Sequence, residues 1–362
     1  APAEEPAPLS AGQLERRRFL IRLGGATAAI TVVGAGLGAA LTRREGSSSV
    51  AESPPEGTPT AAPSADDGLL EPAPGTRPET TPIERHYRID INLTPPAIDE
   101  ADWRLRITGM VDNPLELTLD DLRNNYEPID RFITLECISN RIGGNLIGTT
   151  LWTGASLQAV LADAGVQEGA AYIRIHARDG FWEILPLETL YADERIMLTY
   201  GMDGQPLQQK HGFPLRIYIP DRFGMKQPKW ITELEVMATY DQGYWVERGW
   251  DEEARVRATS VIDTVQAIDE NTVAIGGIAY AGARGISKVE VQIDEGEWVE
   301  AQLRPPLSDT TWVIWRYDWP FEAGAHVFRV RCYEGDGTPQ IEEENDPHPS
   351  GATGIHTAIS NL

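Results

Sequence analysis

The chain has 362 residues, a hydrophobic content of 41% and a formal net charge of −24. This length allows two or three domains, and the hydrophobic content allows a buried core. The acidic balance argues against a nucleic-acid-binding protein, because a phosphate-binding surface needs clustered Lys and Arg. The two cysteines, Cys137 and Cys332, are too few for a disulfide framework.

Residues 1–42 predict an export signal or a membrane anchor. Arg16-Arg17-Arg18-Phe19-Leu20 precedes an apolar run without charges, Leu23 to Leu41, and this arrangement resembles a twin-arginine signal. The run is also long enough to cross a bilayer. No clear Ala-x-Ala cleavage site follows, so we favour an anchor within residues 19–41 over a cleaved signal. Either alternative predicts an extracytoplasmic location, in the periplasm or on the outer face of the membrane.

Residues 43–82 are rich in Ser, Pro, Glu, Ala, Thr and Gly and contain few large apolar side chains. Such a composition buries too little surface to offset the entropy of ordering, so we expect a disordered linker. Folded sequence is expected to begin near Ile83.

Residues 83–249 predict an α+β domain. A short helix is expected after Thr118, which can cap a first turn that contains acids, and another within residues 154–164, where apolar residues recur at helical spacing. Strands are expected at residues 103–109, 132–135, 172–176, 196–200, 215–219 and 231–236. No Gly-x-Gly-x-x-Gly motif opens a helix, which argues against a dinucleotide-binding fold.

Residues 250–362 predict an all-β sandwich. Short runs with alternating hydrophobicity are separated by Gly, Pro and Asp, as is typical of strands joined by turns. Val289, Val291 and Ile293 alternate with polar residues, which predicts one buried and one solvated face. The expected strands are residues 273–280, 288–294, 298–303, 311–318 and 326–332.

Cys137 is the first candidate site residue. Phe132, Ile133 and Leu135 predict a strand, and Ser139-Asn140 together with Gly143-Gly144 predict a loop directly after it. A thiol at a strand end can be held towards a site by a rigid element. A buried structural cysteine is the alternative.

A second candidate segment is His211-Gly-Phe-Pro-Leu-Arg216, followed by Lys226-Gln-Pro-Lys229-Trp230. Its four cationic or ionisable groups border a predicted strand and a Gly-containing loop, an arrangement that suits an anionic phosphate group. A solvated loop with scattered charges is the alternative.

These motifs, Cys137-x-x-Asn140-Arg141 with Trp152-Thr-Gly downstream and the segment His211 to Trp230, resemble the sulfite oxidase family of molybdenum enzymes. The resemblance covers residues 83–362. It implies a mixed, β-rich molybdopterin-binding oxidoreductase domain at 83–249, a molybdenum–molybdopterin cofactor, and an immunoglobulin-like dimerisation domain at 250–362. It also implies a homodimer.

The resemblance further implies roles for individual residues. Cys137 would be the metal ligand, because molybdenum suits a single soft thiolate. The residues expected on the catalytic side are Cys137, Arg88, Arg141, Trp152 and Phe181. Those expected to bind the cofactor are Arg88, Asn140, His211, Arg216, Lys226 and Lys229. The chain departs from the family at Ile142, where a second Arg is common, and at Phe181, where a Tyr is usual.

The leading hypothesis is therefore an exported or membrane-anchored molybdenum oxidoreductase that oxidises sulfite or a similar small oxyanion. No Cys-x-x-Cys-His haem motif is present, so electrons would pass to a separate acceptor such as a cytochrome or a membrane quinone system. One alternative is a molybdenum reductase of sulfoxides or nitrogen oxyanions. An alternative of another class is a non-catalytic surface protein that carries an immunoglobulin-like module.

Overall fold

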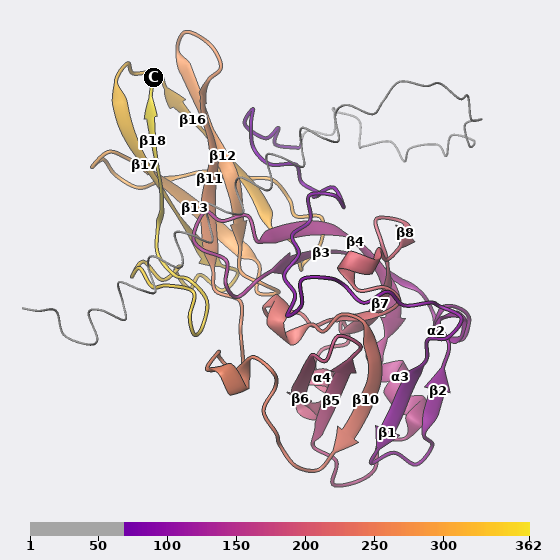
Figure 1. The fold of residues 1–362 in the computed structure, drawn as a ribbon. Coiled ribbons are helices and arrows are strands. Elements are labelled where there is room, and N and C mark those ends of the chain that lie inside the picture. The colour runs from indigo at the N-terminus through magenta and orange to yellow at the C-terminus, as the bar shows by residue number, and fades with distance from the viewer. Residues whose placement is uncertain (1–68) are drawn as a thin grey trace, which may run out of the picture. The chain divides into compact units, whose positions relative to one another are not determined.

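The structure is a computed structural model and describes residues 69–362. Residues 105–237 contain two five-stranded sheets and three short α-helices. The first sheet has the order β2-β1-β10-β5-β6, in which only β1 and β10 run parallel. These strands lie together in the lower part of Figure 1. Their bounds are Leu115–Leu117 for β2, Leu105–Gly109 for β1, Ile231–Met237 for β10, Tyr172–Ala177 for β5 and Trp182–Pro186 for β6.

The second sheet carries the strand that leads to Cys137. It has the order β3-β4-β7-β8, and β9 pairs with β7 outside this path. All its pairings are antiparallel. The bounds are Ile129–Glu136 for β3, Ile147–Ser156 for β4, Met197–Met202 for β7, Gln205–Pro206 for β8 and Arg216–Tyr218 for β9.

The cap that the sequence predicts at Thr118 is confirmed. Thr118 forms a capping box with Asp121 at the start of α2 (Leu119–Asn124). Ser156 caps α3 (Leu157–Ala164), which ends at Gly165 in the left-handed conformation. The third helix, α4, spans Leu187–Ala192. Helices and sheets share a core of aliphatic side chains, which includes Leu105, Leu161 and Leu234.

Residues 259–361 form two four-stranded antiparallel sheets that enclose a second core. One has the order β11-β12-β16-β15 and the other β14-β13-β17-β18. Trp315 and Phe328, one from each sheet, are fully buried in the core that the sheets share. The first sheet comprises Thr259–Ala267, Thr272–Tyr280, Val313–Pro320 and Gln302–Leu303; the second comprises Val299–Glu300, Ile286–Ile293, Ala325–Glu334 and His356–Asn361, each in sheet order.

The alternating pattern located most of these strands, with differences at three places. The run expected at 298–303 is divided into β14 and β15, which belong to opposite sheets. The strands β11 and β18 were not expected. Every second residue of β18 is exposed, and its sequence has no continuous apolar face. The all-β expectation for this region is confirmed at the level of two packed sheets, and its immunoglobulin-like character stays a prediction.

The structure differs from the expected linker at residues 69–82. Arg77 donates hydrogen bonds to both carboxylate oxygens of Asp263 in β11, at 2.6 to 2.9 Å. The backbone N–H of Thr81 donates to the carbonyl of Thr149 in β4. This segment is ordered by polar contacts to distant residues, which a composition argument based on apolar burial does not detect.

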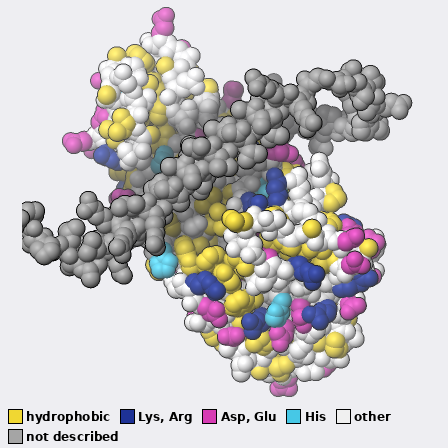
Figure 2. All heavy atoms as spheres, viewed as in Figure 1, with side chains coloured by type: hydrophobic (Ala, Val, Ile, Leu, Met, Phe, Trp, Pro, Cys, Tyr) yellow, Lys and Arg dark blue, Asp and Glu magenta, His cyan; other side chains and the backbone are white. Residues whose placement is uncertain are grey.

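The predicted signal or anchor within residues 1–42 and the predicted linker up to residue 68 lie outside the described residues. Within 69–362, no helix combines the length and apolar character that crossing a membrane requires. On the face shown in Figure 2, Lys and Arg side chains are interspersed with Asp and Glu.

Replacing Arg77 by Met should lower the free energy of unfolding by about 2 kcal/mol, because the mostly buried Asp263 carboxylate loses its charged donor. Urea denaturation measures this difference. Arg106→Met is a matched control, since Arg106 pairs with Glu233 at the surface and should contribute less than about 1 kcal/mol. An unchanged free energy of unfolding in Arg77→Met would contradict a stabilising role for this contact of residues 69–82.

Candidate active site

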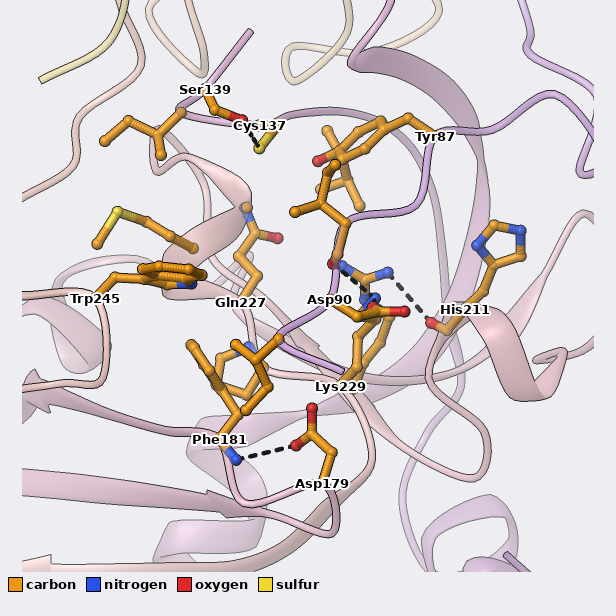
Figure 3. A pocket seen from close by; sticks show the side chains of 18 of the residues that line it. Tyr87, Asp90, Cys137, Ser139, Asp179, Phe181, His211, Gln227, Lys229 and Trp245 are labelled. Atoms are coloured by element: carbon orange, nitrogen blue, oxygen red, sulfur yellow. Dashed lines mark hydrogen bonds and ion pairs between the residues drawn. The ribbon is translucent and has the colours of Figure 1, made fainter. Parts of the chain in front are cut away.

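A cavity of about 260 Å³ lies between residues 86–91, which precede the first strand, and the loops that follow the strands of residues 129–237. Its walls come from five loop regions and from the segment after β10 (Figure 3). In this view Cys137 and Tyr87 lie at one end, Phe181 and Asp179 lie at the other, and Gln227 lies between them. The cavity therefore joins segments that are far apart in the sequence.

Cys137 follows directly on β3 and lines the cavity with a side chain that is 7% exposed. Its backbone N–H donates to the carbonyl of Leu146, and its own carbonyl accepts from Asn140, so a tight turn holds it. Its Sγ atom lies 3.0 Å from the hydroxyl of Ser139. Burial raises the pKa of the Cys137 thiol. The thiol therefore keeps its proton at neutral pH.

Arg216 is the first residue of β9, and it also lines the cavity with only 7% of its surface exposed. Its guanidinium donates to the carbonyl of His211 at 3.2 Å and lies 4.9 Å from the ring centre of Trp152. Within residues 69–362 no carboxylate lies within ion-pair distance of it. Burial lowers its pKa to about 10, which leaves it charged. A buried cation without an acid is poised to bind an anionic ligand.

Lys229 lines the same cavity, but its charge is offset. Its ammonium group contacts the carboxylate of Asp90 and donates to the carbonyl of Ile89 at 3.1 Å. Burial lowers the pKa of Lys229 to about 8, although Asp90 acts in the opposite direction. Arg88 also pairs with Asp90, so one carboxylate serves two cations.

His211 and Phe181, both predicted from the sequence, line the cavity as well. The Nε2 atom of His211 lies 3.1 Å from the carbonyl of Ile83, and burial lowers the pKa of His211 to about 4. The imidazole is therefore neutral at pH 7. The backbone N–H of Phe181 donates to Asp179, and its ring packs 5.5 Å from that of Tyr244.

The structure places five other predicted residues away from the cavity lining. Arg141 extends into solvent, where its side chain is 78% exposed and lies 3.7 Å from Asp346. Asn140 is buried and bonds to Glu136 and to the backbone of Leu146. The three remaining residues are Trp152, which packs in the core beneath Arg216, Lys226, which pairs with buried Glu183, and Arg88, which is partly exposed beside Asp90.

Several lining residues were missed, among them Tyr87, Asp179, Trp245 and Trp250. Burial raises the pKa of Tyr87 well above its usual range, so its hydroxyl stays protonated and can donate a hydrogen bond. Tyr87 adjoins Arg88 in a segment that the motifs had already indicated. The two tryptophans fall where the sequence pattern changes from the first region to the second, and neither has a motif of its own.

Residues 92–245 match the family described as "Oxidoreductase molybdopterin binding domain". The mitochondrial sulfite oxidase of Homo sapiens is 26% identical over 303 residues, which cover 70% of this chain and 55% of that protein. An uncharacterized oxidoreductase of Bacillus subtilis, YuiH, is 30% identical over 154 residues, 42% of this chain and 74% of that protein. The chain thus spans about half the length of the mammalian relatives that it matches.

Among solved structures, the sulfane dehydrogenase SoxCD from Paracoccus pantotrophus has a similar fold. The TM-score is 0.63 at 20% sequence identity, with 74% of this chain and 79% of that chain covered. At this identity the likeness concerns the fold.

Arg216→Gln should lower the molybdopterin content of the purified protein about tenfold or more, because it removes a buried lining cation that has no carboxylate partner among residues 69–362. Arg141→Gln is the control and should leave the content unchanged, since Arg141 extends into solvent. Pterin fluorescence after acid release and metal analysis give both values. Loss of cofactor from the Arg141 variant alone would contradict this assignment of the two arginines.

The cavity fits the cofactor that the matched domain binds: a single buried thiol suits molybdenum, and a buried cation without an acid suits a pterin phosphate. The alternative of a non-catalytic surface protein is set aside by the same match. The chain belongs to the sulfite oxidase-type family of molybdopterin-dependent oxidoreductases.

Proposed function

We propose that this chain oxidises sulfite or a similar small oxyanion at a molybdenum centre and passes the electrons to a separate carrier. The observation that supports this proposal best is the presence of the Cys137 thiol and the uncompensated Arg216 guanidinium in one cavity. When bound, the cofactor supplies the oxygen-atom exchange and accepts two electrons.

The residues of the chain have distinct parts in this proposal. Cys137 would give up its proton and serve as the soft ligand of the metal. Arg216 and Lys229 would hold the anionic part of the cofactor through charge and hydrogen bonds. His211 is neutral and its Nε2–H bonds to a backbone carbonyl, so it would shape this part of the cavity without adding charge. Tyr87, which stays protonated, is placed on the cavity wall to donate a hydrogen bond to an oxyanion.

We extend the proposal to location and assembly on sequence grounds. Arg16-Arg17 and the apolar run behind them support export and retention at the outer face of a membrane. No covalent haem motif is encoded, so a cytochrome or a quinone system would accept the electrons. The two C-terminal sheets would be the immunoglobulin-like module of a homodimer.

A second candidate is a reductase of sulfoxides or nitrogen oxyanions, and the composition of the cavity wall favours it. Phe181, Trp245 and Trp250 line part of the cavity with largely apolar aromatic surface that carries no positive charge to balance a dianion. The cations expected on the substrate side lie elsewhere: Arg141 in solvent and Arg88 beside Asp90. An uncharged substrate with an apolar substituent fits such a wall better than sulfite does.

Steady-state oxidation of sulfite with ferricyanide tests the leading proposal. The unaltered chain should turn over with a high KM, and Phe181→Tyr should lower the KM about tenfold, because a hydroxyl can donate a charge-assisted hydrogen bond to sulfite. Cys137→Ser should keep the fold and the pterin but lose turnover, since a hydroxyl is a poor soft ligand.

Absence of sulfite oxidation in both the unaltered chain and Phe181→Tyr, together with reduction of a sulfoxide by a reduced viologen dye, would favour the second candidate. Full activity of Cys137→Ser would remove Cys137 from the metal site.

Replacing Arg16 and Arg17 by Lys should retain the protein in the cytoplasm of an expressing bacterium, because the twin-arginine pathway depends on the paired guanidinium groups. Cell fractionation and immunoblotting measure the distribution. The control replaces Arg43 and Arg44, which lie beyond the apolar run, by Lys. Unchanged export of the Arg16/Arg17 variant would refute this signal.

A further inference from the structure

Glu183 and Lys226 form an ion pair beneath the cavity. The ammonium nitrogen of Lys226 lies 2.9 Å from Oε1 of Glu183, and the two side chains are 2% and 0% exposed. The same Oε1 accepts a hydrogen bond from the backbone of Ile184, whereas the buried Oε2 has no hydrogen-bond partner in the described part of the chain. Neither residue lines the cavity, so the pair does not serve as a ligand in the site described above.

The pair joins three segments, two of which form cavity wall. Glu183 belongs to β6, and Lys226 belongs to the short 3-10 helix η2 (Gly224–Lys226). Met225 and Gln227, the two neighbours of Lys226, both line the cavity. Holding the Lys226 side chain therefore also fixes the backbone that presents these two residues.

The third segment approaches the pair at Gly243. A Cβ atom at this position would lie 2.0 Å from Oε1 of Glu183, so only glycine allows the chain to pass so close. The backbone N–H of Tyr244 donates to the carbonyl of Trp182 at 3.0 Å. Trp245, directly after these contacts, lines the cavity. The position of the Trp245 wall thus depends on the place of the Glu183 carboxylate.

We propose that Glu183 and Lys226 are positioning residues, which hold the Met225–Gln227 wall and the Trp245 wall at a fixed separation and so determine how closely the cavity fits its substrate. Burying both charges is costly, and a neutral pair of similar volume would often be as stable. What the ion pair adds is a defined direction and distance between β6, η2 and the segment that starts at Gly243. The KM part of the test below rests on the proposed sulfite oxidation.

The experiment compares cofactor-loaded Glu183→Gln, Lys226→Met and the variant with both changes. Each single change leaves a buried charge without its partner and should lower the Tm, whereas the double variant should recover most of the loss. If the pair positions the walls, the double variant should still show faster hydrogen exchange in residues 243–250. Its KM for sulfite should rise about tenfold while kcat stays within about twofold. Molybdenum and pterin content should match those of the unaltered protein.

Asp241→Asn is the matched control. Asp241 lies on the same segment and pairs with Arg174 at 3.2 Å, but the pair is partly exposed, so its loss should change neither exchange nor KM. The proposal would be overturned if the double variant had the same hydrogen exchange in residues 243–250 and the same KM as the unaltered protein. It would also be overturned if Asp241→Asn changed both quantities as much as the double variant does. If the unaltered protein does not oxidise sulfite, the proposed function fails, and the exchange measurement alone still decides the role of the pair.

Discussion

The cost of removing a guanidinium group from water governs the arrangement around the cavity. Arg216 is buried, charged and without a carboxylate in the described part of the chain, whereas Lys229 has Asp90 and Lys226 has Glu183. Such a cation raises the free energy of the empty protein. An anionic cofactor that binds there removes this cost, so cofactor binding and folding stability are coupled. The protein therefore reaches its full folding stability only after the cofactor has bound.

The cavity wall mixes polar and aromatic side chains, and one of the two positions at which the chain departs from the family pattern, Phe181, belongs to it. Phe181 stands where the family usually has Tyr, but Tyr87 places a protonated phenol on the wall near Cys137. A hydrogen-bond donor is thus present, and it comes from another loop. This placement keeps oxyanion chemistry compatible with the site even though the aromatic surface around Trp245 favours less polar molecules.

Motif and alternation predicted those features that depend on local sequence. Cys137, His211, Arg216, Lys229 and Phe181 all line one cavity. Cys137, Arg216 and Lys229 lie at or near the ends of strands that the alternating pattern indicates, whereas His211 and Phe181 were found by the motifs alone. The site prediction was less accurate for the residues that follow Cys137 in its motif. The tight turn after β3 directs Asn140 into the interior and Arg141 into solvent, although both adjoin Cys137 in the motif.

The rest depends on contacts between distant residues, for which local patterns carry no signal. Lys226 and Lys229 look alike in the sequence, but partners 43 and 139 residues away give them different roles. The order of residues 69–82 has the same cause, since their composition is that of a linker while their hydrogen bonds reach β4 and β11.

The contacts of residues 69–82 also limit when this segment can dock during synthesis. The segment is synthesised before every residue that it binds, and Asp263, Arg304 and Trp312 follow it by 186 to 233 positions. The contacts that Arg77 and Glu79 make with these three residues therefore cannot form until the C-terminal region has been synthesised. The hydrogen bond between Thr81 and Thr149 needs only the chain up to β4, so the two ends of the segment become able to dock at different times.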